Sequence, residues 1–211
     1  MAAAALVFYG ISLLLTGGVR IALQVRRTGA TGLHGLARGA EPLEWLAGGL
    51  FVAAVTLGAV SPILVLLDAL DPIAGLDGAT GHAIGIVLAA GGILLTFGAQ
   101  VAMGDSWRIG VDPEERTQLV TGGPFELVRN PIYSAIVPTV LGLVLMVPTV
   151  LAIVALVALI AALELQVRAV EEPHLLRTHG EEYARYAARV GRFVPGVGAM
   201  RRSPTASLPP R

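Results

Sequence analysis

Long apolar segments separated by short polar ones dominate the pattern of this chain. Three apolar runs, at about 3–24, 43–67 and 83–103, each reach the ~20 residues that a helix needs to cross the hydrocarbon core of a membrane. A fourth run is longer, because no charged residue lies between Arg129 and Glu164. As one helix rising ~1.5 Å per residue it would be about 50 Å long, too long for one span and too short for two spans with a full loop.

A proline divides this fourth run. Pro148, in the sequence MVPTV, removes a helix hydrogen bond and bends the chain. The pattern therefore predicts a tight hairpin of two helices, at about 131–147 and 149–168. With the three earlier runs, this makes an all-α polytopic membrane protein with five transmembrane helices.

Beyond the hairpin, residues 171–190 are predicted to form one further helix. A stripe of residues suited to burial recurs there at spacings of four, four, three and four: Leu175, His179, Tyr183, Tyr186 and Val190. Charged residues occupy the opposite face, so we expect a helix packed on the cytoplasmic side of the bundle, at the membrane interface. Residues 197–211 are rich in Pro, Ser and Arg, a composition that predicts a disordered tail.

The basic residues predict the orientation. All fifteen are arginine, and all fall in segments that the five helices place on one side of the membrane. The loop from Asp68 to His82 holds three aspartates and no arginine. By the positive-inside rule, the N-terminus lies outside and the C-terminus in the cytoplasm, in a bacterial plasma membrane. The start, MAAAALVFYG, has no basic n-region and is interpreted as part of a retained span.

This orientation predicts the placement of three residues near the inner surface. Arg20, at the inner end of the first span, is expected to snorkel toward the headgroups. Trp45 and Trp107 are expected to act as aromatic anchors at the inner interface.

Composition agrees with the membrane prediction and excludes several chemistries. The chain of 211 residues is 55% hydrophobic and 14% charged, whereas a soluble domain has about a quarter charged residues. It contains no cysteine, which excludes disulfides, zinc–thiolate sites and thiol nucleophiles. It contains no lysine, which excludes a Schiff base, and its arginines form no stripe of the kind that binds nucleic acid.

Three polar elements converge on the predicted inner face: the loop 104–130, the helix 171–190, and the charged group Arg168, Glu171 and Glu172. In an α-helix, Arg168 would share a face with the two glutamates, which follow it by three and four residues. This group is either a solvated, salt-bridged helix start or a functional site beside a membrane helix.

The loop 119–133 contains Gly122, Gly123 and Pro124 between apolar residues. Glycines permit a close backbone approach to a ligand, and the apolar residues would form the wall of a pocket for a flat ring. The alternative is a structured loop without a ligand. A helix is expected to begin near Pro131, with Tyr133 facing the bundle.

These residues also carry a family resemblance. GPFELVRNPIY, followed by EEPHLLRTHGEEYARYAARVGRFVPG, resembles the isoprenylcysteine carboxyl methyltransferase family and its phospholipid methyltransferase relatives. Their shared pattern is LVxxGxYxxxRHPxY, an apolar hairpin, EExxLxxxhGxxYxxY and a terminal RFxP. The resemblance covers about 117–196, so the chain divides into three membrane helices of unassigned role (1–103), a catalytic part (104–196) and the tail (197–211).

The resemblance implies S-adenosylmethionine as the methyl donor, bound from the cytosol. Phe125 stands where the family has Tyr, and Asn130 replaces the His of RHPxY. Arg129 matches this motif, and Arg168, offset by one residue, is the nearest candidate for the arginine that binds the substrate. The residues that the resemblance places at the donor are Gln118, Leu119, Val120, Phe125, Asn130, Pro131, Tyr133, Glu171 and Glu172.

The physical chemistry of this donor fits the acidic pair. Its sulfonium and ammonium groups are cationic, so neighbouring carboxylates are complementary, and positioning supplies most of the catalysis of an in-line methyl transfer. Neither a metal nor a covalent intermediate is required. The four histidines are dispersed, and only His179, on the packed stripe, is a candidate proton acceptor.

The acceptor stays open. A lipophilic small molecule or lipid is expected, entering between helices. A carboxylate acceptor, such as that of an isoprenylcysteine, is favoured because Asn130 removes a titratable group from the site. The alternatives are a phospholipid N-methyltransferase, an NADPH-dependent membrane reductase of the sterol-reductase type, and a structural or transport protein, although a transporter would have polar groups at mid-membrane.

Overall fold

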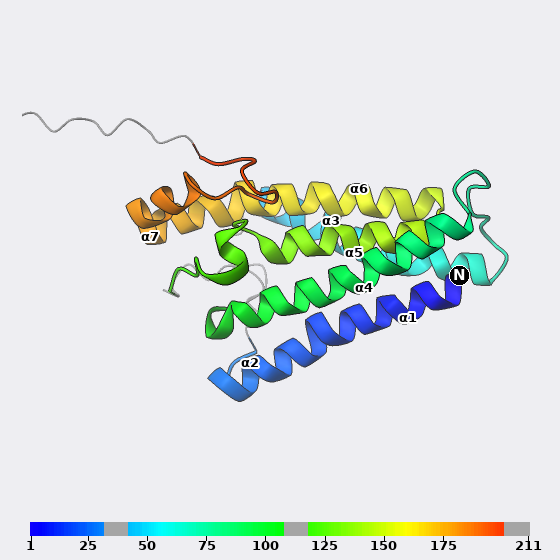
Figure 1. The fold of residues 1–211 in the computed structure, drawn as a ribbon, viewed down its shortest axis with the longest axis horizontal. Helices are drawn as coiled ribbons and strands as arrows, with labels where there is room; N and C mark the ends of the chain where they lie inside the picture. Colours follow the sequence, from blue (N-terminus) through cyan, green and yellow to red (C-terminus); the bar gives the residue numbers. More distant parts are fainter. Residues whose placement is uncertain (32–41, 108–117, 201–211) are drawn as a thin grey trace, which may run out of the picture.

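The computed structural model describes residues 1–31, 42–107 and 118–200, and in these residues the chain is helical, with two isolated β-bridges and no strand (Figure 1). The first apolar segment is one continuous helix, Ala2–Thr28. It comprises α1 (Ala2–Leu13), the π-helical η1 (Leu14–Val19) and α2 (Arg20–Thr28). Gly29 ends it with a left-handed φ of 76°, a conformation that glycine adopts at helix ends without strain.

The next two apolar segments are also single helices. They are α3 (Pro42–Leu66) and α4 (Ala79–Ala102). The loop between them holds Asp68, Asp71 and Asp77, and we call it the acidic loop. A short 3-10 turn, η2 (Gly104–Ser106), follows α4, and a second one, η3 (Gly123–Glu126), precedes the hairpin. Both long helices agree with the predicted spans.

The hairpin is confirmed, including its break. Its first helix, α5 (Pro131–Met146), begins at the predicted proline, and its second, α6 (Val150–Leu165), begins after Pro148. The Thr149 hydroxyl accepts a hydrogen bond from the Ala152 amide at 3.0 Å and so caps α6.

The C-terminal helix differs from its prediction. The helix α7 (Glu172–Ala187) does not start afresh after the hairpin, because the π-helical η4 (Gln166–Glu171) joins it directly to α6. Together they form a continuous helix, Val150–Ala187, of 38 residues. Its only interruption is at Gly180, where φ is 51° and ψ is −123°. The helix is therefore not separate from the hairpin as expected, whereas its position relative to the membrane interface stays a prediction.

The described residues contain four helices long and apolar enough to span a membrane: Ala2–Thr28, Pro42–Leu66, Ala79–Ala102 and Val150–Ala187. The fifth apolar helix, α5, has 16 residues, which give a length of about 24 Å against a hydrocarbon core of about 30 Å. The all-helical polytopic fold is thus confirmed, whereas the count of five full spans is not.

The helices α4 and α5 pack at unusually short range. A Cβ added to Gly92 would lie 2.2 Å from the Thr139 hydroxyl oxygen, and one added to Gly142 would lie 2.5 Å from the Ala89 nitrogen. Small residues that let backbones approach are the usual means of association between membrane helices, where lipid supplies no hydrophobic driving force. On the other side of the bundle, α3 packs against α6 and α1 against α3.

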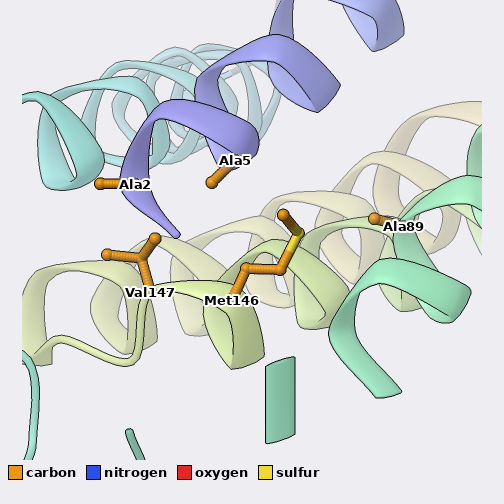
Figure 2. Close-up of a cluster of buried hydrophobic side chains, with 5 residues drawn as sticks. All are labelled: Ala2, Ala5, Ala89, Met146 and Val147. Carbon is orange, nitrogen blue, oxygen red and sulfur yellow. The ribbon is translucent and has the colours of Figure 1, made fainter. Parts of the chain in front are cut away.

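A buried apolar cluster closes one end of the bundle. Figure 2 shows Ala2 and Ala5 of α1 facing Met146 and Val147 at the end of α5, with Ala89 of α4 beside them. The acidic loop lies at the same end, where the Ile73 amide donates to the Pro148 carbonyl at 2.7 Å. At the opposite end lie α2, the segment 118–130 and α7 (Figure 1). We call this second end the arginine-rich end, because the arginines of the described residues lie there.

Arg20 and Trp107 depart from their predictions. Arg20 is 1% exposed and its guanidinium carbon lies 4.4 Å from the centre of the Trp107 ring, which is itself 2% exposed. Both side chains are therefore buried within protein rather than directed to headgroups. Trp45, in contrast, is 59% exposed, as an interfacial anchor should be.

Candidate active site

At the arginine-rich end, the segment before α5 pairs with the segment after α7. Val128 and Gly191 form a parallel bridge. The Arg129 amide donates to the Gly191 carbonyl at 2.8 Å, and the Asn130 amide donates to the Arg192 carbonyl at 3.1 Å. This pairing carries two distant parts of the sequence to the junction of η4 and α7.

Glu172 is held there between two arginines. Its carboxylate accepts from Arg129 Nη2 at 2.6 Å and from Arg192 Nε and Nη2 at 2.8 Å each. The side chains of Arg129 and Glu172 are 1% and 7% exposed. The hydrogen bonds with Glu172 raise the pKa of the Arg192 guanidinium above its ordinary value, despite partial burial. The buried carboxylate is thus compensated by two guanidinium groups.

The remaining hydrogen bonds of Arg129 are to main-chain carbonyls. Its Nη1 donates to Ala187 at 3.0 Å and Val190 at 2.5 Å, and its Nη2 donates to Gly198 at 3.1 Å. A cation at the last carbonyls of a helix also interacts favourably with the helix dipole. Arg129 therefore caps α7 and fixes residues near 198, which the sequence predicted to begin a disordered tail; residues 201–211 of that tail lie outside the described residues.

Glu171 lies beside this ion-pair cluster in a different environment. It is half-buried, and its Oε1 accepts from the Tyr133 hydroxyl at 2.5 Å and from Gln166 Nε2 at 3.4 Å. The two adjacent glutamates thus lie in different surroundings: Glu172 pairs with two arginines, and Glu171 accepts a hydrogen bond from the Tyr133 hydroxyl.

The rest of the predicted donor segment packs against α7. Tyr186 donates its hydroxyl to the Phe125 carbonyl at 2.6 Å, and Leu119 packs against the buried pair Tyr183 and Tyr186. Phe125 is buried.

The other predicted donor residues differ in exposure. Gln118 is exposed, Val120 half-buried and Pro131 buried. The side chain of Asn130 donates from Nδ2 to the Arg192 carbonyl at 3.1 Å, so it helps to hold the C-terminal segment in place.

Arg168 does not join the two glutamates. Its guanidinium pairs with Glu164, and its side chain is 59% exposed. The expected shared face assumed an α-helix, but residues 166–171 form a π-helix with a wider turn. Arg168 is directed to Glu164, four residues earlier, instead of to the two glutamates that follow it.

Sequence reasoning missed two residues of this site. Arg192 completes the ion-pair cluster, and Gln166 contacts Glu171. Arg192 stands in the terminal RFVPG motif that contributed to the family resemblance, so the motif offered a signal. Gln166 offered none, because it follows an apolar run and begins a π-helix that has no sequence signature.

The fold and this cluster define a polytopic helical membrane protein with a charged site where its last long helix leaves the apolar bundle. The sequence model of the phospholipid methyltransferase family matches residues 80–182, which run from the start of α4 into α7. Comparison with curated protein sequences gave no match.

A solved structure has the same fold. It is the eukaryotic intramembrane Ras methyltransferase, isoprenylcysteine carboxyl methyltransferase, at 20% identity and a TM-score of 0.54, with 90% of this chain and 70% of that chain covered. The resemblance predicted from the motifs is therefore confirmed: the family model supports a methyltransferase, and the solved structure shows the shared fold. Neither supports a reductase.

Proposed function

We propose that this protein transfers a methyl group from S-adenosylmethionine to a lipophilic acceptor at the membrane surface. The observation that carries the proposal is the half-buried Glu171 carboxylate, which Tyr133 orients beside the compensated Glu172 cluster. This pair lies inside the segment that matches the methyltransferase family model.

The residues present fit a cationic donor. Two arginines already pair with Glu172, and the neighbouring Glu171 carboxylate, which Tyr133 orients, is complementary to a sulfonium or an ammonium group. We therefore assign the donor contact to Glu171 and a framework role to Glu172. Leu119 and Val120 are half-buried, and Leu119 packs against Tyr183 and Tyr186 of α7; apolar side chains of this kind suit the wall of a pocket for a flat ring.

When bound, S-adenosylmethionine supplies an electrophilic methyl group on sulfur. The chain's part is to hold the reactants in line and to exclude water. Tyr133 keeps the Glu171 carboxylate in one orientation. Arg129 and Arg192, from the segments before α5 and after α7, both bind the adjacent Glu172 and so hold these two segments beside it.

A cavity in the bundle supports a lipophilic acceptor. It has a volume of about 120 Å3 and lies between α1, α3, α5 and α6. Along α5 it begins at Ile136, one turn beyond Tyr133, and ends near Val147. Most of the residues that line it are apolar, and the hydroxyl of the lining residue Tyr9 already donates to the Val55 carbonyl at 2.5 Å, so its wall suits a hydrocarbon chain.

We favour a carboxylate as the acceptor group. A carboxylate is nucleophilic without loss of a proton, and Asn130, which stands in place of a titratable histidine, is engaged with the Arg192 carbonyl. Arg168 is the candidate to orient such an acceptor, since its guanidinium is exposed and shared only with a half-exposed glutamate. Phospholipid N-methylation is the second candidate, because the matching family model carries that description.

Tritiated S-adenosylmethionine and two acceptors separate these possibilities. The purified protein in detergent is given either an S-farnesylcysteine derivative or phosphatidylethanolamine. Counts that are released as methanol by base show a methyl ester and support the favoured acceptor. Base-stable counts in the lipid headgroup support N-methylation instead, and folded protein that transfers to neither overturns both acceptor assignments. Glu171→Gln should abolish the transfer, and Glu182→Gln, at an exposed position of α7, should not.

A further inference from the structure

Three polar residues form a stripe on the first membrane helix. Thr16, Arg20 and Gln24 follow one another at intervals of four residues and therefore share a face. This face is directed at the end of α4 and the turn that follows it, as the hydrogen bonds show. The stripe lies outside the segment that matches the family model.

Arg20 binds the end of α4 directly. Its Nε donates to the Gln100 carbonyl at 3.3 Å and its Nη2 to the Gly104 carbonyl at 2.6 Å. Gly104 adopts a left-handed φ of 59° where α4 gives way to the next turn. The guanidinium thus serves as a side-chain cap for the last carbonyls of α4, with the Trp107 ring against its face.

The other two stripe positions make this connection reciprocal. The Gln100 side chain donates back to the Thr16 carbonyl at 3.0 Å, inside the π-helical η1. The Gln24 side chain donates to the Asp105 carbonyl at 2.9 Å. The first helix therefore binds both α4 and η2 by side chain to main chain hydrogen bonds.

The burial of Arg20 needs this arrangement. A charged group that is 1% exposed in an apolar bundle is costly unless it is compensated. Among the described residues no carboxylate forms an ion pair with it. The negative end of the α4 dipole, two carbonyls and the Trp107 ring supply the compensation instead, so the charge is stable only while α4 and the turn keep this position.

We propose that Arg20 is a positioning residue for the donor site. By capping α4 and fixing Gly104 and Trp107, it sets the point from which the chain proceeds to the donor segment at 118–133. The first membrane helix, whose role the sequence left unassigned, is then part of the catalytic unit. This inference rests on the proposed methyl-donor site.

Arg20→Lys and Arg20→Gln test the proposal through donor affinity. Lysine retains the charge but lacks the planar fork that reaches two carbonyls and stacks on an indole. Both variants should bind S-adenosylhomocysteine at least about tenfold more weakly than wild type in calorimetry. Arg26→Gln, at an exposed position of the same helix, is the matched control and should bind as wild type does.

The fluorescence emission of Trp107 reports on the surroundings of its ring. In folded protein, a general loss of stability would not shift this emission. The chain has two tryptophans, so Trp45→Phe leaves Trp107 as the single fluorophore. In this background, Arg20→Lys should shift the emission to longer wavelength, and saturating S-adenosylhomocysteine should shift it back, because the ligand selects the positioned segment.

The outcomes are distinguishable. If wild type fails to bind S-adenosylhomocysteine, the donor site itself is wrong. If wild type binds and folded Arg20→Lys binds within about twofold of it, with unchanged Trp107 emission, the positioning role is wrong. If Arg20→Lys does not fold, Gln24→Leu, which removes only the bond to Asp105, carries the same test: weaker binding with shifted emission supports the role, and unchanged values for both refute it.

Discussion

Glutamine at position 172 would remove the carboxylate that two arginines share. The substitution Glu172→Gln keeps the volume of the side chain and one carbonyl oxygen. In the wild type, the Arg192 guanidinium donates to both carboxylate oxygens at 2.8 Å. In the variant, an amide NH2 group replaces one of these oxygens, so that two hydrogen-bond donors face each other. Arg129, whose side chain is 1% exposed, would be left as a buried charge without a counter-ion.

The expected cost follows from this geometry. Breaking a buried ion pair by removing one partner costs about 3–5 kcal/mol, because the other charge stays buried. The Arg192 side chain is 16% exposed, so water can solvate it in part. We therefore expect about 3 kcal/mol, at the lower end of this range, which corresponds to roughly a hundredfold change in the unfolding equilibrium.

Equilibrium unfolding in mixed micelles measures this cost. The purified protein in dodecyl maltoside is titrated with sodium dodecyl sulfate, and its helix content is followed by far-UV circular dichroism. Glu182→Gln, exposed on the same helix, is the control and should change the free energy of unfolding by less than about 0.5 kcal/mol. A Glu172→Gln protein as stable as this control would refute the framework role of Glu172.

Three further predictions concern the donor, the bundle and the acceptor. Glu171→Gln should weaken S-adenosylhomocysteine binding at least about tenfold in calorimetry, with stability unchanged; equal affinity would move the donor site elsewhere. Gly92→Ala should destabilise the protein by about 2 kcal/mol, because its Cβ would meet Thr139, whereas Gly91→Ala, with open space around it, should not; equal effects in micelle titrations would contradict the close α4–α5 packing. Arg168→Gln should raise the KM of a carboxylate acceptor without changing donor affinity, and an unchanged KM would exclude Arg168 from acceptor binding.

The sequence was most informative where the signal is local. An apolar run fixes a membrane helix by composition, and Pro148 and Pro131 mark the break and the start of the hairpin by removing hydrogen bonds. The prediction that the arginines lie at one end of the bundle likewise required only the order of the spans along the chain. Which side of the membrane that end faces stays a prediction.

The sequence was least informative where distant segments meet. The pairing of Glu172 with Arg192 depends on the turn after α7, and the burial of Arg20 depends on where α4 ends. The π-helix at 166–171 has no sequence signature, and Arg168 within it pairs with Glu164 rather than with the two glutamates. The acidic pair could therefore be recognised from its motif, while the different environments of its two members could not.

The central claim is that Glu171 lies at a binding site for a cationic methyl donor. Titration of the folded protein with S-adenosylhomocysteine, whose ammonium group retains the charge that Glu171 would bind, tests it most directly. We predict saturable binding of one ligand per chain, at least about tenfold weaker in Glu171→Gln and unchanged in Glu182→Gln. Heat changes no larger than those of dilution, up to millimolar ligand and in protein with its full helix content, would contradict the claim.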